Sequence, residues 1–102
     1  MWALVVRFDL RDENAATGFD GLVAELVPRI AEHEPGTLVY AVHSVEGEPL
    51  SRVFYELYAS REAFDDHERQ EHTKAFLAAR EQYVADLRVE FLTSPTGKGL
   101  QP

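Results

Sequence analysis

The sequence contains no cysteine and few basic residues, and these two shortages exclude several classes of protein. Without cysteine, the 102-residue chain has no disulfide, no thiol nucleophile and no thiolate ligand for a metal. Its 10 lysines and arginines stand against 18 aspartates and glutamates, which gives a formal charge of −8. Because phosphates and anionic lipids attract cations, this balance argues against nucleic acid and membrane surfaces as partners.

Long apolar runs are also missing. No stretch approaches the roughly 18 residues of a membrane-spanning helix. The opening MWALVVRFDL lacks the basic start and the cleavage site of a signal peptide, so we expect a cytoplasmic protein. Hydrophobic residues still make up 45% of the chain, which is enough for one domain with a modest core. We expect this domain at 1–94 and a flexible C-terminal tail, rich in glycine and proline, at 95–102.

Hydrophobic periodicity predicts the element order β-α-β-β-α-β. Alternating apolar residues predict strands at 2–10, 37–45, 52–59 and 88–93. Helical spacing predicts one helix from about Thr17 to the Glu34-Pro35-Gly36 sequence, a short helix capped by Ser60, and another over 71–87. This order is that of an α+β, ferredoxin-like sandwich, in which helices cover one face of a four-stranded sheet.

The two central predicted strands are apolar on both faces. In the strand at 52–59, for example, Tyr55 and Leu57 alternate with Phe54 and Tyr58. Helices on one side cover only one of these faces, and monomers rarely expose large apolar patches. We therefore expect a homodimer in which the two sheets cover each other.

One carboxylate and three histidines stand out as candidates for chemistry. Glu56 lies in mid-strand among aromatic residues, where a carboxylate is unusual and suggests a specific role. If Ala41 pairs with Glu56, His43 shares the face of that carboxylate, and the two groups tune each other's pKa in a pocket. The alternative is a solvated pair at the edge of the sheet.

His67 and His72 lie where one predicted helix ends and the next begins. Either both turn inward, where histidine suits proton transfer near neutral pH, or one caps a helix and the other is solvated. A metal site built from these histidines and Glu56 is chemically possible, but no spacing typical of zinc or iron sites supports it.

Three segments together carry a family resemblance: EPGTLVYAVH, VFYELYASREAFDDH and EHTKAFLAARE. In order and spacing they resemble the antibiotic biosynthesis monooxygenases, also called quinol-monooxygenase-like proteins, over roughly Ala3 to Ser94. The resemblance implies a dimeric α+β barrel of two ferredoxin-like subunits. It also implies a pocket in each subunit and oxygenation of aromatic substrates without metal or flavin, so no cofactor is expected.

Carried over by position, the resemblance implies a substrate pocket lined by Ile30, His43, Phe54, Glu56, Tyr58, Phe64, His67 and Leu77. Two positions depart from the family pattern. Many members carry tryptophan where this chain has Tyr58. A heme-degrading branch places its iron-binding histidine where this chain has Leu77, and leucine cannot bind iron.

These observations favour a cofactor-independent monooxygenase that oxidises a phenol, hydroquinone or polycyclic aromatic with O₂. In this hypothesis His72, assisted by Glu56, removes the phenolic proton, and His43 donates a hydrogen bond to a ring oxygen. One alternative is an isomerase or lyase acting on a small carbonyl compound, which requires Arg7 or Arg52 to point into the pocket. The other is a non-catalytic module that binds a small molecule, since one scaffold hosts many activities.

Overall fold

The structure is a computed structural model, and it describes residues 1–100. The elements are β1 (Trp2–Leu10), α1 (Glu13–His33), β2 (Thr37–Val45), β3 (Glu48–Tyr58), α2 (Arg61–Arg69), α3 (Glu71–Ala79), a 3-10 turn η1 (Arg80–Gln82) and β4 (Val84–Leu92). This confirms the predicted ferredoxin-like α+β class. After Leu92 the described residues form no helix or strand, and the end of the predicted tail, 101–102, lies outside the described part.

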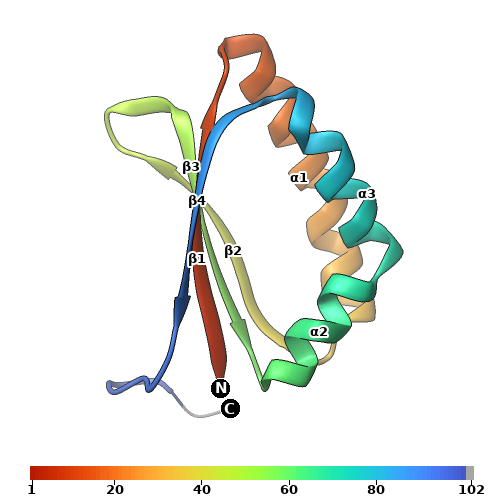
Figure 1. The fold of residues 1–102 in the computed structure, drawn as a ribbon, viewed down its shortest axis with the longest axis vertical. Coiled ribbons are helices and arrows are strands. Elements are labelled where there is room, and N and C mark those ends of the chain that lie inside the picture. The colour runs from red at the N-terminus through yellow and green to blue at the C-terminus, as the bar shows by residue number, and fades with distance from the viewer. Residues whose placement is uncertain (101–102) are drawn as a thin grey trace.

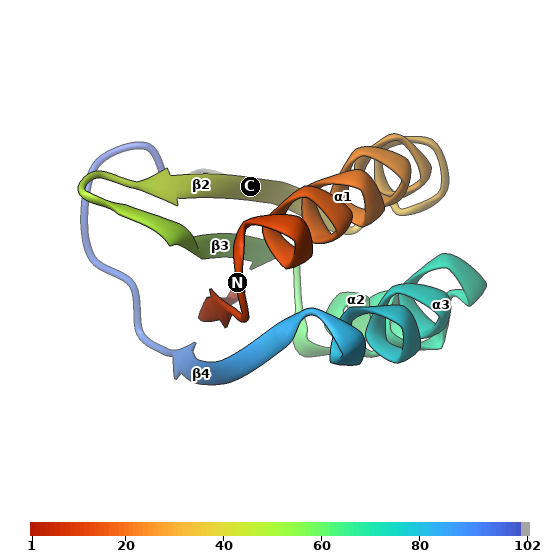
Figure 2. The ribbon, with the colours of Figure 1, turned by 90° about the horizontal axis from the view of Figure 1, so that it is seen from above.

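The strands form one antiparallel sheet in the order β2-β3-β1-β4. All three helices lie on the same side of this sheet, as both ribbon views show (Figures 1 and 2). Among residues 1–100, no helix is both long and apolar enough to cross a membrane.

Helix caps set two of the helix starts. The Ser60 side chain accepts a hydrogen bond from the Ala63 N–H at 3.1 Å, which confirms the predicted cap of α2. The predicted start of the first helix near Thr17 is wrong. Asp12 caps α1 by accepting from the Ala15 N–H at 2.8 Å, so the polar residues after it are already helical.

The boundary between the last helix and the last strand was also predicted wrongly. The helix expected over 71–87 ends at Ala79, and β4 begins at Val84. The chain reverses at Tyr83, whose carbonyl accepts from the Arg11 N–H at 3.0 Å. Pairing with β1 therefore converts Leu87 from a predicted helix position into a strand residue opposite Phe8.

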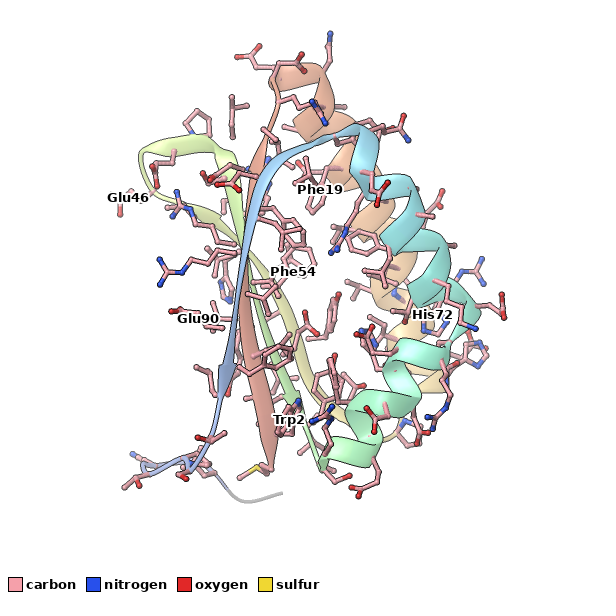
Figure 3. All side chains as sticks on the ribbon, viewed as in Figure 1. Trp2, Phe19, Glu46, Phe54, His72 and Glu90 are labelled. Atoms are coloured by element: carbon pink, nitrogen blue, oxygen red, sulfur yellow. The ribbon has the colours of Figure 1, made fainter. Side chains whose placement is uncertain are left out.

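Aromatic side chains fill the layer between sheet and helices, where Figure 3 places Phe19 and Phe54. The ring of Phe54 lies 4.8 Å from Phe8 and 5.9 Å from Phe19, centroid to centroid. These rings are almost completely buried. Toward the other end of the sheet the same layer contains polar groups, and the candidate site lies there.

Candidate functional site

A cavity of about 130 Å³ lies between the sheet and α2 and α3. Its walls are mostly apolar and aromatic, and its charged groups include two carboxylates, Glu56 and Glu68, and one cation, Arg80. The lining residues used below are Tyr40, Phe54, Glu56, Phe64, His67, Leu77 and Arg80. Val89 and Phe91 of β4 also line it and are 40% and 55% exposed, so the cavity opens toward this edge of the sheet.

Glu56 is the buried carboxylate of this cavity. β3 places it on the helix-covered face, where its residue is only 5% exposed. The Tyr58 hydroxyl donates to Glu56 Oε1 at 2.6 Å, and no other hydrogen bond reaches this carboxylate from the described residues. Burial raises the pKa of Glu56 from 4.5 to about 7, aided by the negative charges of Glu68 and Glu34.

Tyr40 and Arg80 add a hydroxyl and a cation to the same walls. Tyr40 pairs with Glu56 across β2 and β3, and burial raises the pKa of its hydroxyl, which therefore remains a donor. The Arg80 guanidinium lies 5.2 Å from the centre of the Phe8 ring and forms no salt bridge among residues 1–100. Burial lowers the pKa of Arg80, which stays charged.

A second carboxylate, Glu34, joins both histidines of the helix junction. Its Oε1 lies 2.7 Å from His67 Nδ1, and its Oε2 lies 2.5 Å from His72 Nε2. The Thr37 hydroxyl also donates to Oε1, at 2.7 Å. Burial acts to raise the pKa of Glu34, but the hydrogen bonds to His72 and Thr37 and the interactions with His67 outweigh it and lower that pKa.

The tight turn after α1 positions Glu34. The Glu34 N–H donates to the Ile30 carbonyl at 3.0 Å and ends the helix. Gly36 follows, and a Cβ at this position would lie only 2.7 Å from the Cβ of Ala63 in α2. The absence of a side chain at Gly36 thus lets α2 approach closely and brings His67 to Glu34.

Several predicted pocket residues do line the cavity, namely Phe54, Glu56, Phe64, His67 and Leu77. Four others do not, and His43 is one of them. Ile30 is packed in the hydrophobic core, Tyr58 is fully buried and holds Glu56, and His72 lines a groove between α1 and α3 instead. The histidine near Glu56 is therefore His67, whose Nε2 lies 4.0 Å from Glu56 Oε1, and the expected contact of His72 with Glu56 is absent.

His43 lies on the wrong face for its predicted role. In the observed register Tyr40, not Ala41, pairs with Glu56, and His43 pairs with Val53. Neighbouring residues of a strand point to opposite faces, so His43 is directed to the side without helices and is exposed there. It cannot donate to a ring oxygen in this cavity.

Three polar groups of the site were not identified from the sequence. The sequence predicts a helix end at Glu34 and assigns no site role to Glu34, Tyr40 or Arg80. The signal for Glu34 was its place directly before Pro35-Gly36, which buries it beside α2. Arg80 carried no signal, because the predicted end of the helix, at 87, lies eight residues beyond the observed end at Ala79.

Metal ligation is not supported by the arrangement. Within residues 1–100, no three His, Asp or Glu side chains are grouped as ligands for a metal ion. The imidazoles of His67 and His72 are instead turned toward oxygens of Glu34.

A sequence model of the antibiotic biosynthesis monooxygenases matches residues 1–79, well over half of the chain. The chain belongs to this family. The resemblance inferred from the sequence is therefore confirmed. Curated proteins yielded no significant match.

Solved structures agree with this assignment. A candidate antibiotic biosynthesis monooxygenase of Caulobacter crescentus is 26% identical, with a TM-score of 0.86 over 93% of this chain and 90% of that one. Rv0793 of Mycobacterium tuberculosis is 21% identical, with a TM-score of 0.85 over 96% and 98%. PA3566 of Pseudomonas aeruginosa is 18% identical, with a TM-score of 0.81 over 93% and 94%. At these lower identities the last two show a shared fold alone.

Proposed function

We propose that the protein is a cofactor-independent monooxygenase that oxidises a single-ring hydroquinone or phenol with O₂. The observation that carries this proposal is Glu56, a buried carboxylate with a pKa of about 7 in a cavity with aromatic walls. A base is most effective when its pKa lies near the working pH. The family supports a monooxygenase-like scaffold.

In the proposed reaction, Glu56 accepts the phenolic proton of the substrate. The phenolate lies between aromatic walls near the charge of Arg80, and a fixed cation in a site of low dielectric constant stabilises such an anion. In this reaction the hydroxyl of Tyr40, whose side chain lines the same cavity, donates to a ring oxygen.

The electrons and atoms then balance without a cofactor. The hydroquinone anion transfers one electron to O₂, and the resulting radical pair combines to form a carbon–oxygen bond. The peroxide loses water and leaves a hydroxyquinone, so one oxygen atom enters the product and the other becomes water. The substrate supplies every electron that O₂ receives, and the proton taken by Glu56 returns in the water.

The size of the cavity limits the substrate. An apolar cavity of about 150 Å³ holds one benzene molecule, whereas pockets for larger ligands measure roughly 300–1,000 Å³. At about 130 Å³ this cavity fits one ring. We therefore favour single-ring substrates over polycyclic ones.

Oxygen uptake with single-ring hydroquinones, measured in the presence of a chelator, tests the proposal. We expect turnover that yields a hydroxyquinone carrying one atom from ¹⁸O₂, and little turnover of polycyclic phenols. Leu77→Trp, which fills the cavity, should abolish turnover of single-ring hydroquinones. Ala75→Trp, which lies in the groove between α1 and α3, should leave this turnover unchanged. Absence of ¹⁸O from the product, or activity lost in chelator and restored by one metal, would contradict the proposal.

Acid–base isomerisation of a small carbonyl compound is the second candidate, and Arg80 is the observation that favours it. Arg7 is bonded to Asp9 and Glu48, and Arg52 to Asp20, and neither lines the cavity. Arg80 does line it and supplies the cation that an enolate intermediate needs. Turnover without O₂ would identify this activity.

We further propose that two copies pack through the uncovered face of the sheet. This face carries Val39, Ala41, Tyr55 and Leu57 from β2 and β3, and no helix covers it (Figure 1). Burial of such a patch is the main driving force for association.

Tyr55→Asp should disrupt this dimer, because a charge would enter an apolar interface. Sedimentation at micromolar concentration should show a wild-type dimer and a monomeric or aggregated variant. Ala24→Asp, on the exposed side of α1, provides the matched control and should remain dimeric. A stable wild-type monomer would refute the interface.

A further inference from the structure

Glu34 joins two histidines that line different hollows of the structure. His67 lines the cavity, whereas His72 lines the groove between α1 and α3 and has no place in the cavity. The side chains of Glu34 and His67 are 3% and 5% exposed, and that of His72 is 9% exposed. One buried carboxylate thus connects the cavity to a solvent-accessible surface.

The hydrogen bonds define how many charges this cluster holds. Each imidazole presents one nitrogen to Glu34, so the carboxylate accepts from both rings whether these are neutral or charged. A single imidazolium balances the carboxylate charge. Two imidazoliums would leave an excess positive charge, which is costly where water is scarce.

Other groups near the two rings do not remove this constraint. Around His67 lie two carboxylates, one cation and three hydroxyls, which are those of Glu56, Glu68, Arg80, Tyr40, Tyr58 and Thr73, so the one cation stands against two acids. The groove around His72 contains one cation, one further imidazole and two acids, which are Arg29, His33, Glu25 and Glu71. These groups are accessible to solvent and are screened.

We propose that His67 and His72 share a single positive charge through Glu34, so that a proton entering at His67 releases a proton from His72. The role of this shared charge in catalysis rests on the proposed function, whereas the shared charge itself is inferred from the geometry. His72 is then a positioning residue that keeps the cavity base ready, not a group that touches substrate.

Each proton has a defined route. The phenolic proton passes from Glu56 to His67 Nε2 across 4.0 Å, a distance that one water molecule or a small side-chain rotation spans. His67 becomes an imidazolium, still bonded to Glu34 through Nδ1. His72 keeps the proton on Nε2 that bonds Glu34 and loses the one on Nδ1 to solvent. The reverse transfer returns a proton to the cavity when the peroxide loses water.

The protonation of His67, read from ¹⁵N imidazole shifts at one fixed pH, tests the shared charge without any substrate. In His72→Gln, the amide can still donate to Glu34 but carries no charge. We expect the ratio of charged to neutral His67 to rise about tenfold, the size of coupling at which two sites no longer titrate independently. His72→Phe should give the same result if the amide disturbs the fold.

His33→Gln is the control, because His33 lies 6.1 Å from the His72 ring, centroid to centroid, and has no hydrogen bond to Glu34. The His67 signal should be unchanged in this variant. An unchanged His67 in both His72 variants would overturn the proposal. Because no turnover is measured, a protein that oxidises no quinol could still pass this test, and an active oxygenase could fail it.

Discussion

Glu56→Gln is expected to lower turnover by about 10²- to 10⁴-fold, the usual contribution of a positioned base. The amide cannot accept the phenolic proton, yet it keeps an oxygen that can accept from the Tyr58 hydroxyl. The cavity should therefore retain its shape while losing its base. Steady-state rates with a single-ring hydroquinone measure the effect.

The substrate provides a check on the origin of this loss. A phenol has a pKa near 10, so at pH 7 only about one molecule in a thousand is ionised. A quinol of lower pKa, or a higher pH, should partly restore the Glu56→Gln rate, since the substrate then arrives deprotonated. A loss that is equal at every pH and for every quinol would mean that Glu56 supports the structure only.

The same substitution should stabilise the protein at high pH. The folded-state pKa of Glu56 is about 7 and the unfolded value about 4.5, so the folded state holds the proton more tightly. Wild-type stability therefore falls as pH rises from 4.5 to 7, by up to about 3 kcal/mol. Glu56→Gln lacks this loss. The gain in free energy of unfolding of Glu56→Gln over wild type, measured in urea, should be larger at pH 8 than at pH 5. The substitution thus increases stability while it lowers turnover.

Local patterns predicted most of the fold. β1 and β2 begin and end where alternation of apolar residues predicted, and Ser60 caps α2 as its side chain suggested. The last boundary failed because Tyr83 and Leu87 also continue the helical spacing from Phe76. Pairing of β4 with β1, a contact distant in sequence, decides that these residues leave the helix.

The site was harder to predict, because it depends on register and on contacts between distant elements. A shift of one residue between β2 and β3 separates the predicted position of His43 from the observed one. Glu56 was predicted because a carboxylate amid strand aromatics is unusual. The position of His67 beside Glu56 could not be predicted. It depends on Glu34, and Glu34 meets His67 only because α2 packs closely against Gly36.

Glu34→Ala should cost about 3 to 5 kcal/mol of stability, the typical effect of removing one partner from a buried charged network. The substitution leaves His67, His72 and the Thr37 hydroxyl without their acceptor in a buried place. Because the pKa of Glu34 is lowered, its contribution is present above pH 4.5 and is lost as pH falls through the folded-state pKa. The difference from wild type in urea unfolding should therefore be full near pH 7 and shrink in acid.

Glu32→Ala is the matched control, since Glu32 lies two residues earlier, in α1. Its side chain is exposed and forms an ion-pair contact with His33 at 3.7 Å. It should change stability by less than about 0.5 kcal/mol, as exposed substitutions usually do. Glu34→Gln should fall between the two, because its one amide oxygen can still accept while its amide N–H₂ now faces a second donor. If Glu34→Ala were no less stable than Glu32→Ala at neutral pH, Glu34 could not be what holds the α2–α3 junction. The position of His67 beside Glu56 would then depend on helix packing alone.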